Sequence, residues 1–404
     1  MRTKVALAAC PDYSPANVQA AVETLVANLG GPARNATHPP ASPVAKPLRA
    51  GSVAGGLAAW VRPGQTVLLK PNLLSARTPE QAVTTHPEVV RALIRMVKAV
   101  GGVPIVADSA CSAIQIERVW EKTGFKAMCG EESVPLVNLE KSSSVQFNRA
   151  GVVYSVAKPV LEAALVINMP KLKTHMLTAL TNAVKNIYGT LPGFQKTMLH
   201  KQYPTPLQFC AFLAALYARV KPGLTISDAV VAMEGNGPSA GELVPLGFLA
   251  GSTDGVALDA AMCRILKIPL NKVSYLGLLQ RAGVGTADWS QIELVGNVPL
   301  PLQRPPFRVP VTAGLLNRIP IWLVQLLAPY VWIRPSFTAR CVKCGLCVKA
   351  CPVTALHMAE GSGPVLTPSV CIGCCCCHEV CSQRAVDMTQ SFLLNLRKRG
   401  KLPS

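Results

Sequence analysis

The 404-residue sequence lacks the glycine-rich signatures of common nucleotide-binding folds. It has no Gly-x-Gly-x-x-Gly after a predicted strand and no Walker loop, so neither a dinucleotide fingerprint nor a P-loop is predicted. Aromatic residues make up only 5% of the chain. No basic stretch is interleaved with aromatic residues, and no nucleic-acid-binding module is recognisable. We therefore expect no specific binding to nucleic acid.

The sequence predicts neither a disulfide framework nor a signal peptide. Ten of the fifteen cysteines lie between residues 341 and 381, and the other five are scattered singly, which fits a reducing compartment. The apolar run near the start, Val5 to Ala9, has five residues and is too short for the apolar core of a signal peptide. It predicts a first β-strand, and we expect a cytoplasmic protein.

The sequence contains no uninterrupted apolar run long enough for a spanning helix, which needs about 20 mostly apolar residues. The stretch 315–333 is apolar but is interrupted by two prolines and three polar residues. We expect 301–338 to be a Pro-rich linker that packs on the protein. The alternative is peripheral contact with a membrane surface, to which the basic tail 391–404 would contribute.

Acidic residues are scarce. The chain has 40 Lys and Arg against 21 Asp and Glu, a net charge of +19, and residues 301–404 have 12 against 3. Such a surface attracts acidic proteins, membrane headgroups and other anions.

Cysteine, by contrast, is concentrated in two runs, 341–351 and 371–381. Both runs keep gaps of two, two and three residues between four cysteines. Bacterial two-cluster ferredoxins hold [4Fe–4S] clusters with this spacing, and the fourth cysteine of each run serves the other cluster. The spacing therefore predicts two [4Fe–4S] clusters. One is bound by Cys341, Cys344, Cys347 and Cys381, and the other by Cys371, Cys374, Cys377 and Cys351.

Two alternatives remain open for these cysteines. A pair of structural zinc sites shares the Cys-x-x-Cys element, but it does not need a third cysteine in the run followed by a fourth and a proline. Cys375 and Cys376 also permit a slipped ligand set in the second run. Alignment of the two runs favours Cys371, Cys374 and Cys377.

Before the linker, apolar strands alternate with amphipathic helices. This alternation predicts an α/β fold in residues 1–300, based on a parallel sheet covered on both faces. A small α+β ferredoxin-like domain is expected at 339–390. Ligands of such sheets gather at the carboxyl ends of the strands. Lys70, Asn72 and Asp108 follow predicted strands in this way and are candidate substrate-binding residues.

A third buried strand, 163–168, leads into Lys171, Lys173 and His175. In an extended chain these three side chains lie on one face. We predict that they clamp a carboxylate or phosphate, with Lys171 binding the anion, and with Lys173 and His175 in catalytic roles that include proton exchange. Lys196 and His200 are predicted to lie in a loop.

Several motifs give the chain a family resemblance. They are Val67-Leu-Leu-Lys-Pro-Asn72, Thr85-His-Pro87, Met169-Pro-Lys-Leu-Lys-Thr-His175, Ala183-Val-Lys-Asn186 and Met233-Glu-Gly-Asn-Gly-Pro238, followed by the two cysteine runs. With them the chain resembles the iron–sulfur-bearing members of domain-of-unknown-function family 362. The resemblance implies an α/β domain followed by a two-[4Fe–4S] ferredoxin domain. Its motifs add further candidate substrate-binding residues, namely His86, Lys185, Asn186, Glu234 and Asn236.

Together these features predict an iron–sulfur electron-transfer protein of the oxidoreductase type. Its ferredoxin domain would serve an anion-binding site in the α/β domain, and its partners would be a redox protein and an anionic small molecule. The alternative is a non-catalytic carrier of electrons or iron–sulfur clusters, or an assembly factor, that docks a protein partner.

Overall fold

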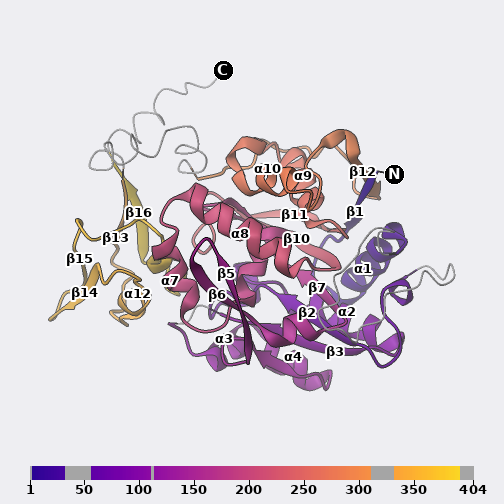
Figure 1. Ribbon diagram of the computed structural model, residues 1–404, viewed down its shortest axis with the longest axis horizontal. Coiled ribbons are helices and arrows are strands. Elements are labelled where there is room, and N and C mark those ends of the chain that lie inside the picture. The colour runs from indigo at the N-terminus through magenta and orange to yellow at the C-terminus, as the bar shows by residue number, and fades with distance from the viewer. Residues whose placement is uncertain (1, 32–55, 111–112, 311–331, 392–404) are drawn as a thin grey trace.

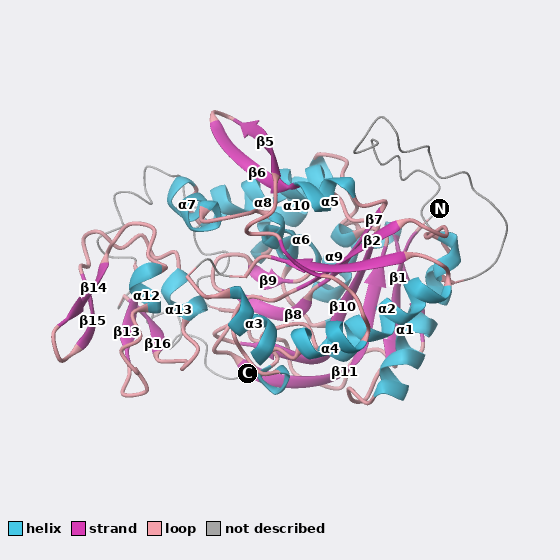
Figure 2. Cartoon of the chain, turned by 90° about the horizontal axis from the view of Figure 1, so that it is seen from below, coloured by secondary structure: helices cyan, strands magenta, loops and turns pink. Residues whose placement is uncertain are grey.

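The structure is a computed structural model that describes residues 2–31, 56–110, 113–310 and 332–391. A large α/β part comes first in the chain, and a small part that contains both cysteine runs lies beside helix α7 (Gln195–Gln202) (Figures 1 and 2). The predicted linker helix at 315–333 falls, apart from its last two residues, outside the described residues, and so does the basic tail from 392. In the part that is described, no helix is long and apolar enough to cross a membrane.

Within the described residues, ten strands form the main sheet, in the spatial order β12-β1-β11-β10-β7-β2-β3-β4, with β8 paired to β10 and β9 to β8. Their bounds are β1 (Thr3–Ala9), β2 (Thr66–Pro71), β3 (Val103–Asp108), β4 (Leu136–Asn138), β7 (Leu165–Met169), β8 (Lys171–His175), β9 (Ala179–Thr181), β10 (Leu224–Glu234), β11 (Glu242–Ser252) and β12 (Ile292–Gly296). Strands β4, β3, β2, β7 and β10 are parallel, and β11 runs antiparallel between β10 and β1. The α/β prediction is confirmed.

Helices cover both faces of this sheet (Figure 2). One face carries α1 (Pro15–Leu29), α2 (Pro87–Ala99), α3 (Ile116–Lys122) and α4 (Phe125–Glu131). The other carries α5 (Lys158–Glu162), α6 (Ala183–Asn186), α8 (Pro206–Val220), α9 (Gly255–Ile265) and α10 (Ser274–Arg281). A separate antiparallel hairpin, β5 (Ser144–Arg149) and β6 (Val152–Ala157), was not expected from the sequence.

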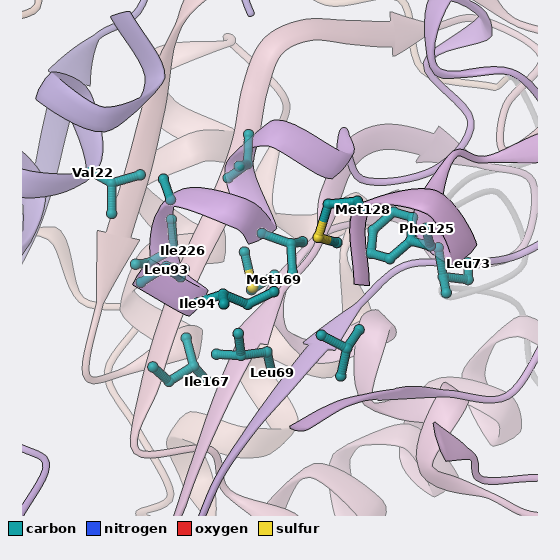
Figure 3. Close-up of a cluster of buried hydrophobic side chains, with 14 of the residues drawn as sticks. Val22, Leu69, Leu73, Leu93, Ile94, Phe125, Met128, Ile167, Met169 and Ile226 are labelled. Atoms are coloured by element: carbon teal, nitrogen blue, oxygen red, sulfur yellow. The ribbon is translucent and has the colours of Figure 1, made fainter. Parts of the chain in front are cut away.

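The two faces have separate hydrophobic cores because side chains alternate along each strand. Leu69 packs in the core under α1, α2 and α4, and its neighbour Leu68 packs against α5 on the opposite face. Figure 3 shows Leu69 with Leu93, Ile94 and Ile167 in the first of these cores. Burial on both faces explains why the central strands read as continuous apolar runs.

The small part has the same elements twice. Each cysteine run contains a short helix and is followed by a strand: α12 (Leu346–Lys349) with β14 (Leu356–Ala359), and α13 (Cys376–Val380) with β16 (Val386–Gln390). Strand β13 (Ile333–Phe337) pairs antiparallel with β16, and β15 (Gly363–Leu366) pairs with β14. This arrangement confirms the predicted small α+β domain.

Candidate functional site

Two cavities in the small domain are lined by the predicted cluster ligands. The first cysteine cavity is lined by Cys341, Cys344, Cys347 and Cys381. The second cysteine cavity is lined by Cys371, Cys374, Cys377 and Cys351, together with Cys375 and Cys376. The fourth cysteine of each run thus lies in the cavity of the other run, as in the arrangement predicted from the spacing.

The backbone aligns the two runs residue by residue. Lys343 and Gly345 in the first run have φ of 56° and 73°, and the matching Gly373 and Cys375 both have φ of 65°. Cys375 therefore occupies the left-handed position that Gly345 occupies in the first run, where such a conformation favours glycine. This repeat matches Cys371, Cys374 and Cys377 to the first three cysteines of the first run, without a slip.

The fourth cysteines also share a hydrogen bond. The backbone N–H of Ala355 donates to Cys351 Sγ at 3.2 Å, and that of Ala385 donates to Cys381 Sγ at 3.3 Å. Donors to sulfur stabilise thiolate ligands and tune iron–sulfur sites. In the described part of the chain, no group of three or more His, Cys, Asp or Glu converges on one point. Four thiolates around a cavity suit a four-iron cluster.

A third and more open cavity lies between the two domains, and we call it the interdomain pocket. Its walls come from strand ends of the large domain, from α6 and α7, and from α13 of the small domain. The lining residues are Lys70, Asn72, Leu74, Asp108, Ser109, Ala110, Thr181, Lys185, Asn186, Tyr188, Gly189, Lys196, Thr197, His200, Cys376 and Glu379. Five candidates from the sequence are among them: Lys70, Asn72, Asp108, Lys185 and Asn186.

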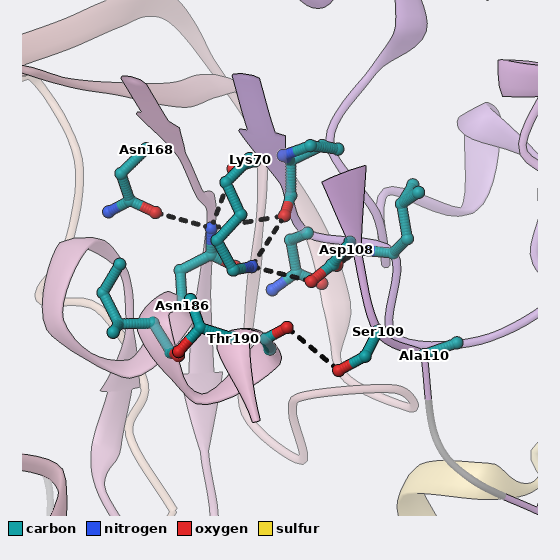
Figure 4. Close-up of polar contacts among 12 residues, drawn as sticks. Lys70, Asp108, Ser109, Ala110, Asn168, Asn186 and Thr190 are labelled. Carbon is teal, nitrogen blue, oxygen red and sulfur yellow. Dashed lines mark hydrogen bonds and ion pairs between the residues drawn. The ribbon is translucent and has the colours of Figure 1, made fainter. Parts of the chain in front are cut away.

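An ion pair forms the floor of the pocket (Figure 4). Lys70 Nζ lies 2.8 Å from Asp108 Oδ1, and Asp108 Oδ2 accepts the backbone N–H of Leu73 at 2.7 Å. Both side chains are buried. Burial lowers the pKa of Lys70, against the opposing effect of Asp108. Gly189 approaches this pair so closely that a Cβ there would lie 2.2 Å from Asp108 Oδ1, so the close approach requires glycine.

Two further lysines face the pocket. Lys196 Nζ donates to Ser109 Oγ at 2.8 Å and to the carbonyl oxygen of Ala110, which fixes the loop after β3. Lys185 Nζ lies 4.6 Å from the ring centroid of Tyr188, a cation–π distance. Among the described residues, no carboxylate lies within ion-pair distance of Lys185. Burial lowers the pKa of Lys185, against the opposing effect of Glu379, and a bound anion would favour the charged form of this lysine.

The small domain contributes Cys376 and Glu379. Burial opposes ionisation of Glu379, but His175, Lys185 and His200 outweigh it and lower the pKa of this carboxyl to about 2. Burial lowers the pKa of His200 to about 3, so this ring is neutral near pH 7. The pocket therefore contains the cations of Lys70, Lys185 and Lys196 against the anions of Asp108 and Glu379.

The predicted clamp of Lys171, Lys173 and His175 does form a strand, β8, but none of the three lines the pocket. Lys171 Nζ lies 2.9 Å from Asp228 Oδ2 and donates to the hydroxyl of Tyr13 at 2.6 Å. Lys173 Nζ donates to the carbonyl oxygen of Val83. In the structure these three residues are buried in β8, and both lysines have partners within the chain.

His175 lies behind Glu379, with its Nε2 3.1 Å from Glu379 Oε1. Its Nδ1 accepts the backbone N–H groups of Leu177 at 3.1 Å and Thr178 at 3.4 Å. Because Nδ1 accepts, it carries no proton, and the hydrogen of the neutral ring is on Nε2, toward the carboxylate. This arrangement leaves His175 no free lone pair with which to take up a proton.

The other candidates from the sequence lie in structural contacts. The His86 ring stacks on Tyr13, with 3.8 Å between centroids. Glu234 pairs with Arg304 at 2.8 Å and with Arg308 at 2.7 Å. The carbonyl oxygen of Asn236 lies 3.1 Å from His378 Nε2, so its loop holds the small domain in place rather than lining the pocket.

The structure adds pocket residues that the sequence reading had missed as site residues. Lys196 and His200 lie in helix α7, not in the predicted loop, and their spacing of four residues places them on one helix face. Glu379 follows Cys377 by two residues, within the helix that leaves the second cysteine run. The helical spacing of Lys196 and His200, and the nearness of Glu379 to the second cysteine run, were the sequence signals that could have identified these residues.

Comparison with known proteins gives matches over both domains. A family model described as "Domain of unknown function (DUF362)" matches residues 67–264, and one described as "4Fe-4S binding domain" matches residues 337–357. The chain is 33% identical over 235 residues to the thylakoid-associated protein sll1697 of Synechocystis sp., covering 57% of this chain and 72% of that protein. It is 54% identical over 33 residues to the methylamine utilization ferredoxin-type protein MauM of Methylophilus methylotrophus, covering 8% and 15%.

Proposed function

This chain belongs to the DUF362 family and has an iron–sulfur electron-transfer domain of the 4Fe-4S type, and from that premise we propose that it is an oxidoreductase acting on an anionic small molecule in the interdomain pocket. The cysteine usage supports a reducing, cytoplasmic setting for it.

We assign two [4Fe–4S] clusters to the two cysteine cavities. Cys341, Cys344, Cys347 and Cys381 would hold one, and Cys371, Cys374, Cys377 and Cys351 the other. When bound, such clusters accept and donate single electrons. The support is the crossed placement of the fourth cysteines, the matched backbone of the two runs and the paired N–H donors to Cys351 and Cys381.

One observation carries the link between electron transfer and the pocket. Cys376 lines both the second cysteine cavity and the interdomain pocket. The Cys376 side chain is therefore part of the wall that separates a molecule in the pocket from the second cysteine cavity. Without such a shared wall, the α/β domain would have no evident electronic connection to the cysteine runs.

The lining of the pocket favours a carboxylate or a phosphate. Three lysine ammonium groups outnumber two carboxylates, and Asn72 and Asn186 add amide groups that can donate hydrogen bonds. Lys185 lies close enough to Glu379 and Cys376 to interact with both, and we infer that the anionic end of the ligand binds this ammonium.

Two residues expected to be catalytic take other roles in this proposal. His175 is a positioning residue, because its Nε2 faces the Glu379 carboxylate and its Nδ1 is occupied by backbone donors. Lys173 is buried in β8, where its side chain donates a hydrogen bond to the carbonyl oxygen of Val83. In this proposal it does not contact the ligand in the pocket and acts there only through its charge.

The experiment begins with protein purified anaerobically in full length, from which small molecules are released and identified by mass spectrometry. Binding of inorganic phosphate is then measured for wild type, Lys185→Met and the control Lys201→Met, an exposed lysine at the end of the same helix as Lys196. Lys185→Met should weaken binding at least about tenfold, since a hydrogen bond to a charged group contributes ~1.5–3 kcal/mol. Lys201→Met should bind like wild type.

The co-purified molecule should also reoxidise reduced protein. If neither phosphate binding nor reoxidation depends on Lys185, the pocket is not the anion site. The carrier or assembly-factor alternative, in which the large domain only docks a protein partner, would then explain the molecule better.

A further inference from the structure

The first cysteine cavity lies at the outer end of the small domain. It shares no lining residue with the interdomain pocket, whereas the second cavity shares Cys376. Cys344 is exposed, and Val342, which also lines this cavity, is 61% exposed. In both Figures 1 and 2 the hairpin of β14 and β15 lies at the end of the molecule farthest from β1. We therefore take the interdomain pocket and the first cysteine cavity as the two ends of the electron-transfer path.

An exposed apolar patch surrounds this outer end, and we call it the outer face. It consists of Val342 in the first cysteine run and Met358 in β14, which are 61% and 41% exposed. Strand pairing sets Met358 opposite Pro364, which lines the first cysteine cavity, and cross-strand partners share one face of a hairpin. Apolar side chains that are exposed together beside a site indicate a contact surface.

Basic residues predominate around the outer face. Arg340, Lys343 and Lys349 are all exposed, and residues 338–359 contain no Asp or Glu. Glu360, in the turn of the hairpin, is the next acidic residue along the chain. An apolar centre with a basic rim complements a protein surface that is apolar at its centre and acidic at its rim.

We propose that the outer face docks a small acidic protein that carries one electron, of the flavodoxin class. Docking there places the partner's redox centre near the exposed Cys344. The exchange moves one electron and no atom: the reduced carrier is oxidised by one electron, and this protein is reduced by one. The inference rests only on the iron–sulfur part of the proposed function and does not require a ligand in the pocket.

A protein partner fits these observations better than an anionic membrane. The apolar residues here lie on a loop and a two-stranded hairpin, not on a helix with one apolar and one basic face, which is the usual membrane-surface element. The exposed cysteine at the centre also explains why an electron carrier, rather than any acidic protein, would bind.

The test uses full-length protein with its full iron content and a reduced flavodoxin as the electron donor. Stopped-flow absorbance measures reduction of this protein, and calorimetry measures binding of oxidised flavodoxin. The variant combines R340E, K343E and K349E, and a milder one replaces the same residues with Gln. The control is Lys4→Glu, an exposed lysine on β1.

For wild type and the control, the rate and the affinity should fall as salt increases, because charge steers the encounter. The Glu variant should be at least tenfold slower and bind at least tenfold more weakly at low salt, and the Gln variant should fall between. Reduction by dithionite, which is small and needs no docking surface, should be the same for all variants.

Three outcomes would overturn the proposal: no binding of flavodoxin to wild type, equal rates in wild type and the Glu variant, or a wild-type rate that does not depend on salt. Co-sedimentation with phosphatidylserine vesicles that is lost in the Glu variant would instead assign the face to a membrane. Since no pocket ligand is present in these assays, their failure would leave the pocket proposal standing, and the reverse is also true.

Discussion

At the scale of single residues, Lys173 shows how burial gives a side chain a pH dependence. It is fully buried, and its ammonium donates to the carbonyl oxygen of Val83. Burial lowers the pKa of Lys173 to about 7 from an ordinary value of 10.5. Between these two values the unfolded chain binds more protons than the folded chain, so folding stability rises with pH over that window.

We predict that Lys173→Met removes this contribution. The slope for one such group approaches ~1.4 kcal/mol per pH unit between pH 7 and pH 10. Wild type should therefore gain stability relative to the variant as the pH is raised, and the variant should be relatively most stable near pH 7 and below. Anaerobic urea unfolding at several pH values, followed by circular dichroism, measures the difference. A difference in unfolding free energy that does not change with pH would show that Lys173 has the same charge in the folded and the unfolded chain over this range.

Arg77 is a second residue whose role depends on the small domain. Its side chain is buried, Nη1 donates to the carbonyl oxygen of Ser382 at 2.6 Å, and Nη2 donates to that of Cys381. Burial lowers the pKa of Arg77 to about 10, so it remains a cation near pH 7. A positive charge beside a predicted cluster ligand favours the reduced, more negative state.

Arg77→Met should therefore lower one reduction potential, by roughly 60 mV, which corresponds to about a tenfold change in equilibrium constant for one electron. An anaerobic redox titration measures it, with Arg95→Met, whose side chain is 55% exposed, as the control. Unchanged potentials at wild-type iron content would mean that Arg77 only fastens the two domains together.

At the scale of elements, the short helix α6 depends on a carboxylate from another helix. Asp259, in α9, accepts the backbone N–H of Ala183 at 2.9 Å and that of Val184 at 3.1 Å, and also the hydroxyl of Tyr275 at 2.9 Å. These N–H groups belong to the first turn of α6, where a helix has no internal acceptors for them. The next residue is Lys185, so Asp259 fixes the lysine that faces the pocket.

We predict that Asp259→Ala destabilises the fold by about 3 kcal/mol or more, because each buried donor left without an acceptor costs ~1–3 kcal/mol. Phosphate affinity should fall along with stability, since α6 is released. Asp259→Asn, which keeps one acceptor oxygen, should have an intermediate effect, and the exposed control Glu117→Ala should have almost none. Urea unfolding and phosphate titration measure both effects; a loss of stability without a loss of affinity would separate α6 from the pocket.

Elements and site differ in how far the sequence predicts them. Strand ends at Lys70 and Asp108 could be predicted because buried parallel strands read as apolar runs and their polar residues follow at the carboxyl end. Helix α7 could not, because it has eight mainly polar residues and no side-chain hydrogen bond at its N-cap. The pairing of Lys171 with Asp228 could not be predicted, because Asp228 comes from a distant strand and sequence spacing does not reveal such a pairing.

At the scale of the whole molecule, the site exists only because the two domains are held together. Ser239 Oγ donates to the carbonyl oxygen of Glu379 at 3.0 Å, and Arg77 donates to the ligand loop of the second run. The pocket is therefore lined by residues as far apart in the sequence as Lys70 and Glu379. Local periodicity cannot predict how two domains dock, whereas the cysteine spacing within one run could be interpreted directly.

The crossed fourth cysteines allow the two ends of the path to be separated. Cys351 belongs to the first run but lines the second cavity, and Cys381 belongs to the second run but lines the first. Wild-type protein made anaerobically should contain about eight iron atoms and matching sulfide per chain. We predict that Cys381→Ser damages the outer site and that Cys351→Ser damages the site beside the pocket.

The two variants should therefore lose different properties. Cys381→Ser should lose fast reduction by flavodoxin but keep a phosphate-dependent change in the electron paramagnetic resonance spectrum of its remaining cluster, because Cys376 still lies between that site and the pocket. Cys351→Ser should keep the fast reduction and lose the phosphate response. The opposite pattern would mean that each run binds its own cluster without crossing, and stoichiometric zinc without sulfide would refute the clusters themselves. Because each variant controls for the other, a general loss of folding would appear as the loss of both responses and could not be mistaken for either pattern.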